Sequence, residues 1–162
     1  MQRQMRSCLG GCFVAAIISI ALGGLLPGAA AEPREAPETT IRAVLEKWTA
    51  DFNAGNAEEV CNLFSPELRY DFRGQSERNY KDICSLLHHS LEDGRKKYAY
   101  TLQIKEILVW GELAVVRLVW TLRMWSINPP GSFAQSIEPG MDIFRRQADG
   151  SWKIIRYLAY EE

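Results

Sequence analysis

The sequence predicts a single α+β domain, with helices in the amino-terminal half and a sheet in the carboxyl-terminal half. Between residues 39 and 94 the apolar residues recur mainly at helical spacing. From Tyr98 onward the period changes to two, which is typical of strands with one buried face. Near the carboxyl end, Asp149-Gly150 separates two apolar-rich runs, a strong hairpin signal. Helices gathered on one side of an antiparallel sheet make an α+β domain.

Residues 1–31 have the pattern of a secretory signal peptide. A basic start and an apolar stretch lead to Ala29-Ala30-Ala31, which offers signal peptidase the small residues that it needs. The sequence therefore predicts a periplasmic or secreted protein that begins at Glu32, with a linker over residues 32–38. An uncleaved membrane anchor is the alternative, because the uncharged stretch is just long enough to span a bilayer. Pro27 argues against an anchor.

Composition and motifs exclude several classes of function. The chain has 19 basic and 20 acidic residues, and loss of Arg3 and Arg6 with the signal leaves 17 against 20. This balance, without a basic stripe, argues against nucleic acid as a partner. No later segment is long enough to cross a membrane. No motif for a nucleotide, a metal or a catalytic triad is present, so neither a cofactor nor a metal site is predicted.

The first helix is expected to begin at Thr39 or Thr40, either of which can cap its amino end. Gly55 ends it, because glycine tolerates the left-handed conformation that follows many helices. One face of this segment is apolar at helical spacing: Ile41, Val44, Leu45, Trp48 and Phe52. That face is expected to be buried.

Two more helices are expected before the long strands. Asn56, with Glu59 three residues on, resembles a capping box and predicts a short second helix ending before Pro66. Asn79 and Asp82 have the same spacing and predict a third helix, which ends near Gly94. The sequence therefore predicts three helices that precede most of the sheet.

The strands follow from alternation. A short strand over residues 69–73 places Tyr70 and Phe72 on the inward face and Asp71 on the other. Residues 98–110 and 113–125 form two long strands with a tight turn between them. The even positions of the second long strand form an unbroken apolar face: Ala114, Val116, Leu118, Trp120, Leu122 and Met124. A loop at residues 128–131 precedes the closing hairpin.

Cys61 and Cys84 are the cysteines that remain after signal removal. In an oxidising compartment such a pair is expected to form a disulfide. Both lie on the apolar stripes of predicted helices, so the bridge would join the second helix to the third and stabilise the fold by roughly 3 kcal/mol. Two buried thiols are the alternative.

Three segments carry a resemblance to a known family: Trp48-Thr-Ala-Asp-Phe-Asn-Ala-Gly-Asn56, Leu63-Phe-Ser-Pro66, and Phe144-Arg-Arg-Gln-Ala-Asp-Gly-Ser-Trp-Lys-Ile154. In this order and spacing the chain resembles the NTF2-like superfamily, in particular its SnoaL-like, ketosteroid-isomerase-like branch of the DUF4440 type. The resemblance implies an NTF2-like domain over residues 39–162. It implies a cone in which three amino-terminal helices pack in a strongly bent antiparallel sheet, with a pocket open at one end. Many members form dimers through the sheet.

The isomerases of this branch use an acid on the first helix and a base on the strand after the second. The resemblance places Trp48 at the acid position, where those enzymes have tyrosine, and Phe72 at the base position, where they have aspartate. Asp71 is adjacent to the base position, but alternation turns it to the opposite face unless a bulge intervenes. The departures at both positions favour a protein without this isomerase chemistry.

Six residues are expected to line an apolar pocket for a flat or greasy ligand: Trp48, Tyr70, Phe72, Trp120, Asp142 and Tyr157. The aromatic members could equally be ordinary core. Asp142 lies among apolar neighbours, which would raise its pKa and suit a base. Its alternative is an edge aspartate that meets Arg123, Arg145 or solvent.

Three functions remain open. The favoured one is an exported, non-catalytic domain that binds a small apolar or aromatic molecule, or a protein partner, and forms a homodimer through the sheet face carrying Arg117, Arg123 and Trp125. The second is an isomerase-like or lyase-type enzyme that transfers a proton with Asp142 or Asp71. It predicts a buried carboxylate beside a second polar group in an open pocket. The third is a structural adaptor, which predicts a filled cone and a large exposed apolar patch.

Overall fold

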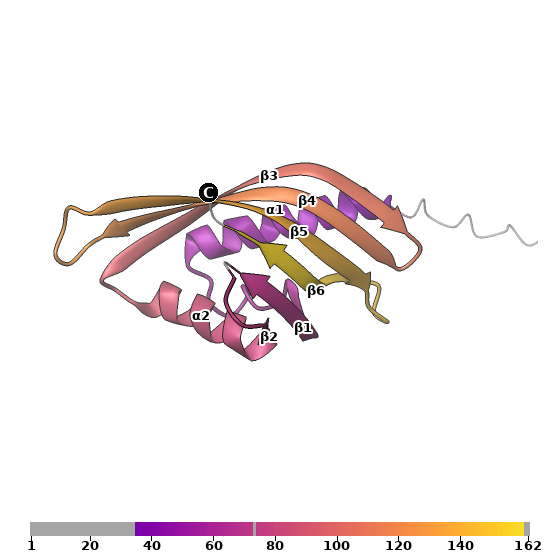
Figure 1. The fold of residues 1–162 in the computed structure, drawn as a ribbon, viewed down its shortest axis with the longest axis horizontal. Coiled ribbons are helices and arrows are strands. Elements are labelled where there is room, and N and C mark those ends of the chain that lie inside the picture. The colour runs from indigo at the N-terminus through magenta and orange to yellow at the C-terminus, as the bar shows by residue number, and fades with distance from the viewer. Residues whose placement is uncertain (1–34, 73, 161–162) are drawn as a thin grey trace, which may run out of the picture. The chain divides into compact units, whose positions relative to one another are not determined.

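The structure, a computed structural model, describes residues 35–72 and 74–160. The predicted signal peptide and residues 32–34 of the predicted linker therefore lie outside the described residues. The described chain runs through eight elements (Figure 1): α1 (Pro37–Ala54), β1 (Phe64–Phe72), β2 (Arg78–Asn79), α2 (Tyr80–Glu92), β3 (Lys96–Trp110), β4 (Leu113–Ser126), β5 (Phe133–Arg146) and β6 (Trp152–Ala159). Neither of these helices is long and apolar enough to cross a membrane.

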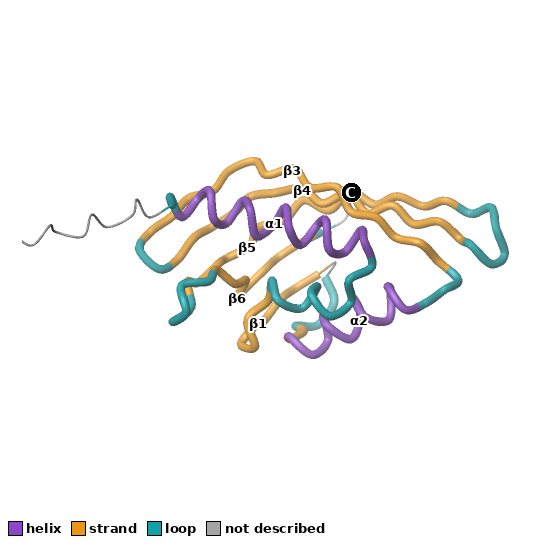
Figure 2. The backbone as a smooth tube through the Cα atoms, turned by 180° about the vertical axis from the view of Figure 1, so that it is seen from behind, coloured by secondary structure: helices purple, strands orange, loops and turns teal. Residues whose placement is uncertain are grey.

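The six strands form one curled sheet in the order β2-β1-β6-β5-β4-β3. The strands from β3 to β6 pair with antiparallel neighbours, but β1 lies parallel to β6. The expectation of an antiparallel sheet is thus wrong at this one pair. The reason is connectivity, because β1 precedes the long hairpins and meets the last strand only after the chain has returned across the sheet. Figure 2 shows α1 lying along one face of this sheet, here called the inner face.

Helix α1 covers the inner face with the side chains predicted for it. Ile41, Leu45, Trp48 and Phe52 are all buried. The helix begins at Pro37, inside the predicted linker and before Thr39, and its amino end has no side-chain cap. Proline suits this first turn, where its missing N–H would have no partner in any case. Gly55 ends the helix in the left-handed conformation with φ 79°, as predicted.

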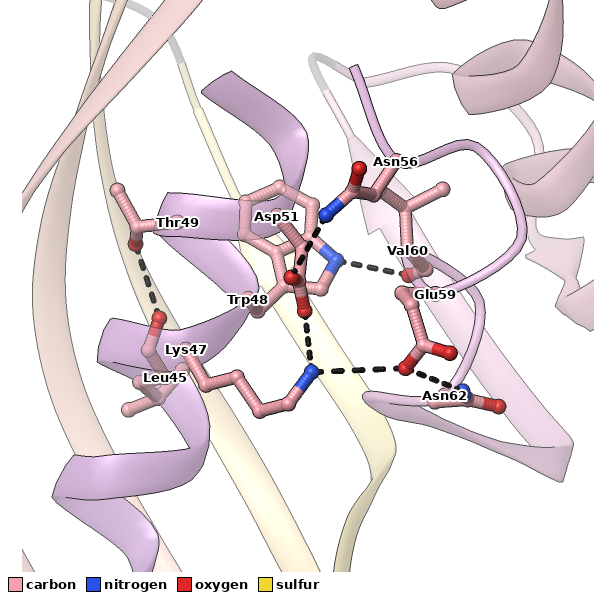
Figure 3. A network of polar contacts seen from close by, with 9 residues as sticks. All are labelled: Leu45, Lys47, Trp48, Thr49, Asp51, Asn56, Glu59, Val60 and Asn62. Atoms are coloured by element: carbon pink, nitrogen blue, oxygen red, sulfur yellow. Dashed lines mark hydrogen bonds and ion pairs between the residues drawn. The ribbon is translucent and has the colours of Figure 1, made fainter. Parts of the chain in front are cut away.

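The short second helix is not formed, so the prediction of three helices is wrong. Residues 57–63 are turns, and β1 begins at Phe64 and continues through Pro66. The side chains expected to cap the helix are used elsewhere (Figure 3). The amide of Asn56 donates to Asp51 at 3.2 Å, and Glu59 accepts from Lys47 at 3.4 Å. A segment this short gains little from helix formation, because nucleation is unfavourable.

The third predicted helix is confirmed as α2. Asn79 Oδ1 accepts from the backbone N–H of Lys81, and the carboxylate of Asp82 accepts from the backbone N–H of Asn79, both at 2.9 Å. The predicted disulfide is also present. It joins Cys61 and Cys84 with their Cα atoms 5.6 Å apart. It connects a turn segment to α2 and does not connect two helices.

The remaining strands match the predicted alternation. The even face of β4 begins with Ala114, Val116 and Leu118, which are all buried. The turn at Gly111-Glu112 separates β3 from β4 as expected. The closing hairpin is confirmed, although β5 begins well before the expected point. The backbone N–H of Gln147 donates to the Ser151 carbonyl at 2.7 Å and closes the turn between β5 and β6.

Candidate functional site

A cavity of about 110 Å³ lies between the inner face of the sheet, the end of α1 and the side of α2. All six residues predicted to line a pocket lie on it: Trp48, Tyr70, Phe72, Trp120, Asp142 and Tyr157. Their role in binding a ligand stays a prediction. A dry cavity of roughly 150 Å³ holds one benzene molecule. The volume therefore suits a molecule of one ring or a short branched chain, or one end of a larger molecule.

Four polar residues of the cavity form one row across the sheet. Strand pairing places Asp142 of β5 beside Tyr157 of β6, Tyr157 beside Tyr70 of β1, and Tyr70 beside Arg78 of β2. All four line the cavity. Neighbouring strands lie about 4.8 Å apart, so each member of this row is next to the following one. We call Asp142, Tyr157, Tyr70 and Arg78 the polar row.

Asp142 is the most unusual member of the polar row. Its residue is only 5% exposed, and none of the described residues donates a hydrogen bond to its carboxyl group. Burial raises the pKa of Asp142 from 3.8 to about 7. At neutral pH both the acid and the carboxylate form are therefore present, which suits a group that gives and takes protons.

The alternative interpretation of Asp142 as an edge residue is wrong. Strand β5 lies between β4 and β6, so neither of its sides is a sheet edge. The two arginines expected as its partners bond elsewhere. Arg123 donates to Gln135 at 3.3 Å, and Arg145 pairs with Glu67 at 2.5 Å. Asp142 therefore faces the cavity without a cation from either residue.

Tyr70 and Tyr157 supply the hydroxyl groups of the polar row. Their rings stack with centroids 4.3 Å apart and planes 17° apart. This side-by-side arrangement gives no well-formed bond between the hydroxyls, and the buried hydroxyl of Tyr70 has no hydrogen-bond partner among the described residues. The pKa of Tyr157 is raised far above its ordinary value, first by burial and then by Tyr70, with Asp142 adding to it. Tyr157 therefore stays protonated and can act as a donor.

Small residues in the next row of the inner face keep the cavity open. Pairing places Leu118, Gly140, Ala159 and Phe72 side by side on consecutive strands. A Cβ atom at Gly140 would lie 3.1 Å from the carbonyl oxygen of Leu158, which is closer than ordinary packing. Gly140 and Ala159 therefore leave a hollow between two large side chains.

Trp48 forms a wall of the cavity, but its N–H group faces away from any ligand. The indole Nε1 donates to the carbonyl oxygen of Val60 at 2.7 Å (Figure 3). The same ring packs edge-on against Trp120, with centroids 5.1 Å apart. Trp48 thus fixes the turn segment to α1, and it contributes apolar surface to the cavity.

The weaker catalytic candidate, Asp71, is not part of the site. Its side chain is exposed on the outer face, and the pairing of β1 with β6 is continuous from Arg69 to Phe72, so no bulge turns it inward. A second acid that the sequence did not single out, Glu138, does line the cavity. It is buried, and Ser136 Oγ donates to it at 2.8 Å. Among the described residues no cluster of three or more metal-binding side chains occurs.

Sequence reasoning missed Arg78, Gly140 and Glu138 for a common reason. None of them belongs to a motif, and each reaches the cavity only through the pairing of its strand with the next one. The sequence of one strand does not show which residues of the neighbouring strand its own residues pair with. The polar alternation around Glu138 was the one available signal, because a buried acid inside a strand is unusual.

A profile of the SnoaL-like domain matches residues 45–157. The chain belongs to the SnoaL-like family, within the NTF2-like superfamily. The match covers every element except the first turns of α1 and the end of β6, and so it includes the whole polar row. No curated protein gives a significant match to the chain.

Several solved structures share the fold of this chain. A conserved protein from Planctomyces limnophilus is 19% identical with a TM-score of 0.72, covering 80% of this chain and 98% of its own. A candidate dehydratase of the NTF2-like family from Streptomyces avermitilis is 15% identical with a TM-score of 0.65, covering 78% and 99%. A ketosteroid isomerase-like protein from Erwinia carotovora is 17% identical with a TM-score of 0.62, covering 76% and 94%.

Proposed function

We propose that this domain binds a small, mainly apolar molecule in the cavity and transfers a proton on it, with Asp142 as the general acid or base. One observation carries this proposal, namely a buried carboxyl group that faces an open apolar cavity beside hydroxyl donors. This is the arrangement that the enzyme hypothesis predicts and that a purely binding domain does not require. The placement of Asp142 therefore shifts the preference from the non-catalytic function to the catalytic one.

Different members of the polar row can serve as the base and as the hydrogen-bond donor in such a reaction. Asp142, with a pKa of about 7, can take a proton from a carbon next to a carbonyl group at neutral pH. Negative charge then develops on the carbonyl oxygen, which a hydroxyl donor such as Tyr157 can stabilise. Isomerisation and dehydration share this first step, and the isomerase-like and dehydratase-like structural neighbours fit it. A cavity of about 110 Å³ holds a one-ring or short-chain substrate, or the reacting end of a larger one.

Hydrogen exchange in heavy water tests the proposal without a known substrate. A panel of one-ring and short-chain ketones, enones and β-hydroxy carbonyl compounds would be incubated with the protein in D₂O. NMR spectroscopy then follows deuterium incorporation and loss of water. We expect exchange on at least one compound, and we expect Asp142→Asn to abolish it. Asp71→Asn is the matched control on the outer face and should exchange at the wild-type rate. Equal exchange by the wild type and Asp142→Asn would refute the role of Asp142.

Two features beyond the site complete the proposal. The signal-peptide pattern and the Cys61–Cys84 disulfide support export to an oxidising compartment. Mass spectrometry of the exported protein should give a chain beginning at Glu32. The outer face exposes apolar side chains such as Met141 and Leu158, which pair side by side and support a homodimer through the sheet. Sedimentation equilibrium should then give twice the monomer mass.

A further inference from the structure

Arg78 is a charged member of the polar row that the proposed proton transfer does not use. It is partly buried on β2, lines the cavity, and makes no ion pair or side-chain hydrogen bond with any residue of the described chain. An arginine on the outer face of the adjacent strand behaves differently. Arg69 forms an ion pair with Glu77 at 3.7 Å. A guanidinium that is partly removed from water and has no partner is disfavoured unless a ligand supplies one.

Tyr70 is the strand partner of Arg78, and its hydroxyl group also lacks a hydrogen-bond partner among the described residues. Tyr70 is 2% exposed and its oxygen has no hydrogen-bond partner among the described residues. Strand pairing places Tyr70 directly opposite Arg78, and both line the cavity. A buried polar group left without a partner costs about 1–3 kcal/mol. Two residues paired on adjacent strands at one end of the cavity therefore each have hydrogen-bond donors without a partner among the described residues.

We propose that the ligand of this cavity is a small carboxylic acid, whose carboxylate is bound by Arg78 and accepts a hydrogen bond from Tyr70. The planar guanidinium matches a carboxylate with two parallel hydrogen bonds. A phosphate with two charges fits less well, because the same cavity holds the acidic side chains of Glu138 and Asp142. Among the described residues that line the cavity, Arg78 is the one cation, and one guanidinium matches one carboxylate.

The position of Arg78 also sets where the rest of the ligand lies. Arg78 and Asp142 occupy opposite ends of the polar row, three strand spacings apart, or roughly 14 Å between Cα atoms on a flat sheet. Their side chains extend into the cavity and shorten the remaining gap. With the carboxylate at Arg78, the far end of a small ligand lies near Asp142. This inference rests on the proposed function, since it assigns Asp142 the reacting end and Arg78 the anchoring end.

Calorimetric titration with two matched pairs of probes tests the inference: benzoate with benzamide, and isobutyrate with isobutyramide. Each pair has the same shape and differs in charge. At slightly acidic pH, where Asp142 is neutral, we expect the wild type to bind each acid at least about tenfold more tightly than its amide. Arg78→Gln should bring acid and amide to within about twofold of each other while leaving the affinity for the amide unchanged. The unchanged amide affinity shows that the cavity is intact.

Three further variants sharpen the test. Arg69→Gln removes the same charge from the adjacent outer face and should keep the full preference for the acid. Arg78→Lys keeps the positive charge but lacks the planar guanidinium, so it should keep only part of the preference for the acid. Tyr70→Phe should weaken acid binding several-fold and amide binding less. An equal affinity for acid and amide in the wild type, a preference that survives Arg78→Gln, or no binding of any probe up to its solubility limit would each overturn the inference.

The two proposals fail in different ways. If Asp142→Asn abolishes deuterium exchange while Arg78→Gln leaves the acid preference intact, the carboxylate anchor is wrong and the proton transfer stands. If Arg78 governs the acid preference while Asp142→Asn leaves exchange unchanged, the cavity binds acids and the proton transfer is wrong.

Discussion

The inner and outer faces of the sheet carry the same kinds of charged residue in opposite states. On the inner face, Asp142 and Arg78 line the cavity without partners among the described residues. On the outer face, Asp71 is exposed and Arg69 pairs with Glu77. Two of these residues, Asp71 and Arg69, belong to the same strand. The comparison shows that the face a side chain occupies, more than its type, sets how far it is removed from water and whether it has a partner within the fold.

The largest expected difference between the faces is the effect of pH on stability. The pKa of Asp142 is about 7 in the fold and about 3.8 in the unfolded chain. Below about pH 4 Asp142 is neutral in both the folded and the unfolded state and does not change the free energy of unfolding. From about pH 4 to pH 7 the unfolded chain ionises while the fold does not, so stability is lost by about 4 kcal/mol and then levels off. Asp142→Asn should remove this loss and make the protein more stable above pH 7.

Urea unfolding of the wild type and Asp142→Asn across this pH range measures the effect. The two curves should coincide at the acidic end and separate as pH rises. Asp71→Asn serves as the outer-face control and should follow the wild type throughout. A wild-type curve that falls in parallel with that of Asp142→Asn would show that Asp142 titrates normally in the fold.

The second effect concerns the disulfide that joins two segments packed over the inner face. The Cys61–Cys84 disulfide holds α2 against the turn segment that precedes β1, and Leu63 and Leu87 on these two segments line the cavity. Replacing both cysteines with serine should lower the free energy of unfolding by about 3 kcal/mol, because the unfolded chain gains freedom. Addition of a reducing agent should destabilise the wild type similarly and leave the double variant unchanged. Equal stability of the two proteins without reductant would contradict a formed bridge.

A pair of tryptophans gives the third comparison. Trp48→Phe removes the donor to the buried carbonyl of Val60 and should destabilise the fold by about 2–3 kcal/mol. Trp110 is on the outer face and is 60% exposed. Trp110→Phe should change stability by less than about 0.5 kcal/mol, as other surface substitutions do. Thermal unfolding of both variants measures the contrast, and equal losses would mean that the bond of Trp48 contributes little.

The smallest expected effect belongs to an outer-face ion pair. Arg117 bonds to Glu106 at 3.2 Å, and both side chains are largely in water. Arg117→Gln should therefore lower stability by less than about 0.5 kcal/mol, and added salt should remove the difference. A larger loss that disappears on dilution would instead place Arg117 in the proposed dimer interface.

The fold was predictable wherever the pattern was local. Alternation located the strands and their faces, and the side chains of Asn79 and Asp82 marked the start of α2 correctly. The same reasoning failed at Asn56, because its amide bonds to Asp51 at the end of α1 and does not cap a new helix. A capping motif shows which bonds are available but not which competing partner is nearer.

The site was predictable only in part. The aromatic residues and Asp142 were visible as an apolar group with one carboxyl among them. Arg78 and Gly140 were not, since their importance comes from the strand beside them. Predicting them required the register of β1 with β6, which joins residues far apart in the sequence.

That pairing has a consequence for the growing chain. Tyr70 and Arg78 leave the ribosome about half a chain length before Tyr157, and strand β1 has no neighbour on one side until β6 is made. No shorter nascent chain can therefore assemble the polar row. Contacts of such long sequence separation also form slowly. The cavity should appear only at the last stage of folding, and removal of β6 should abolish it completely instead of weakening it.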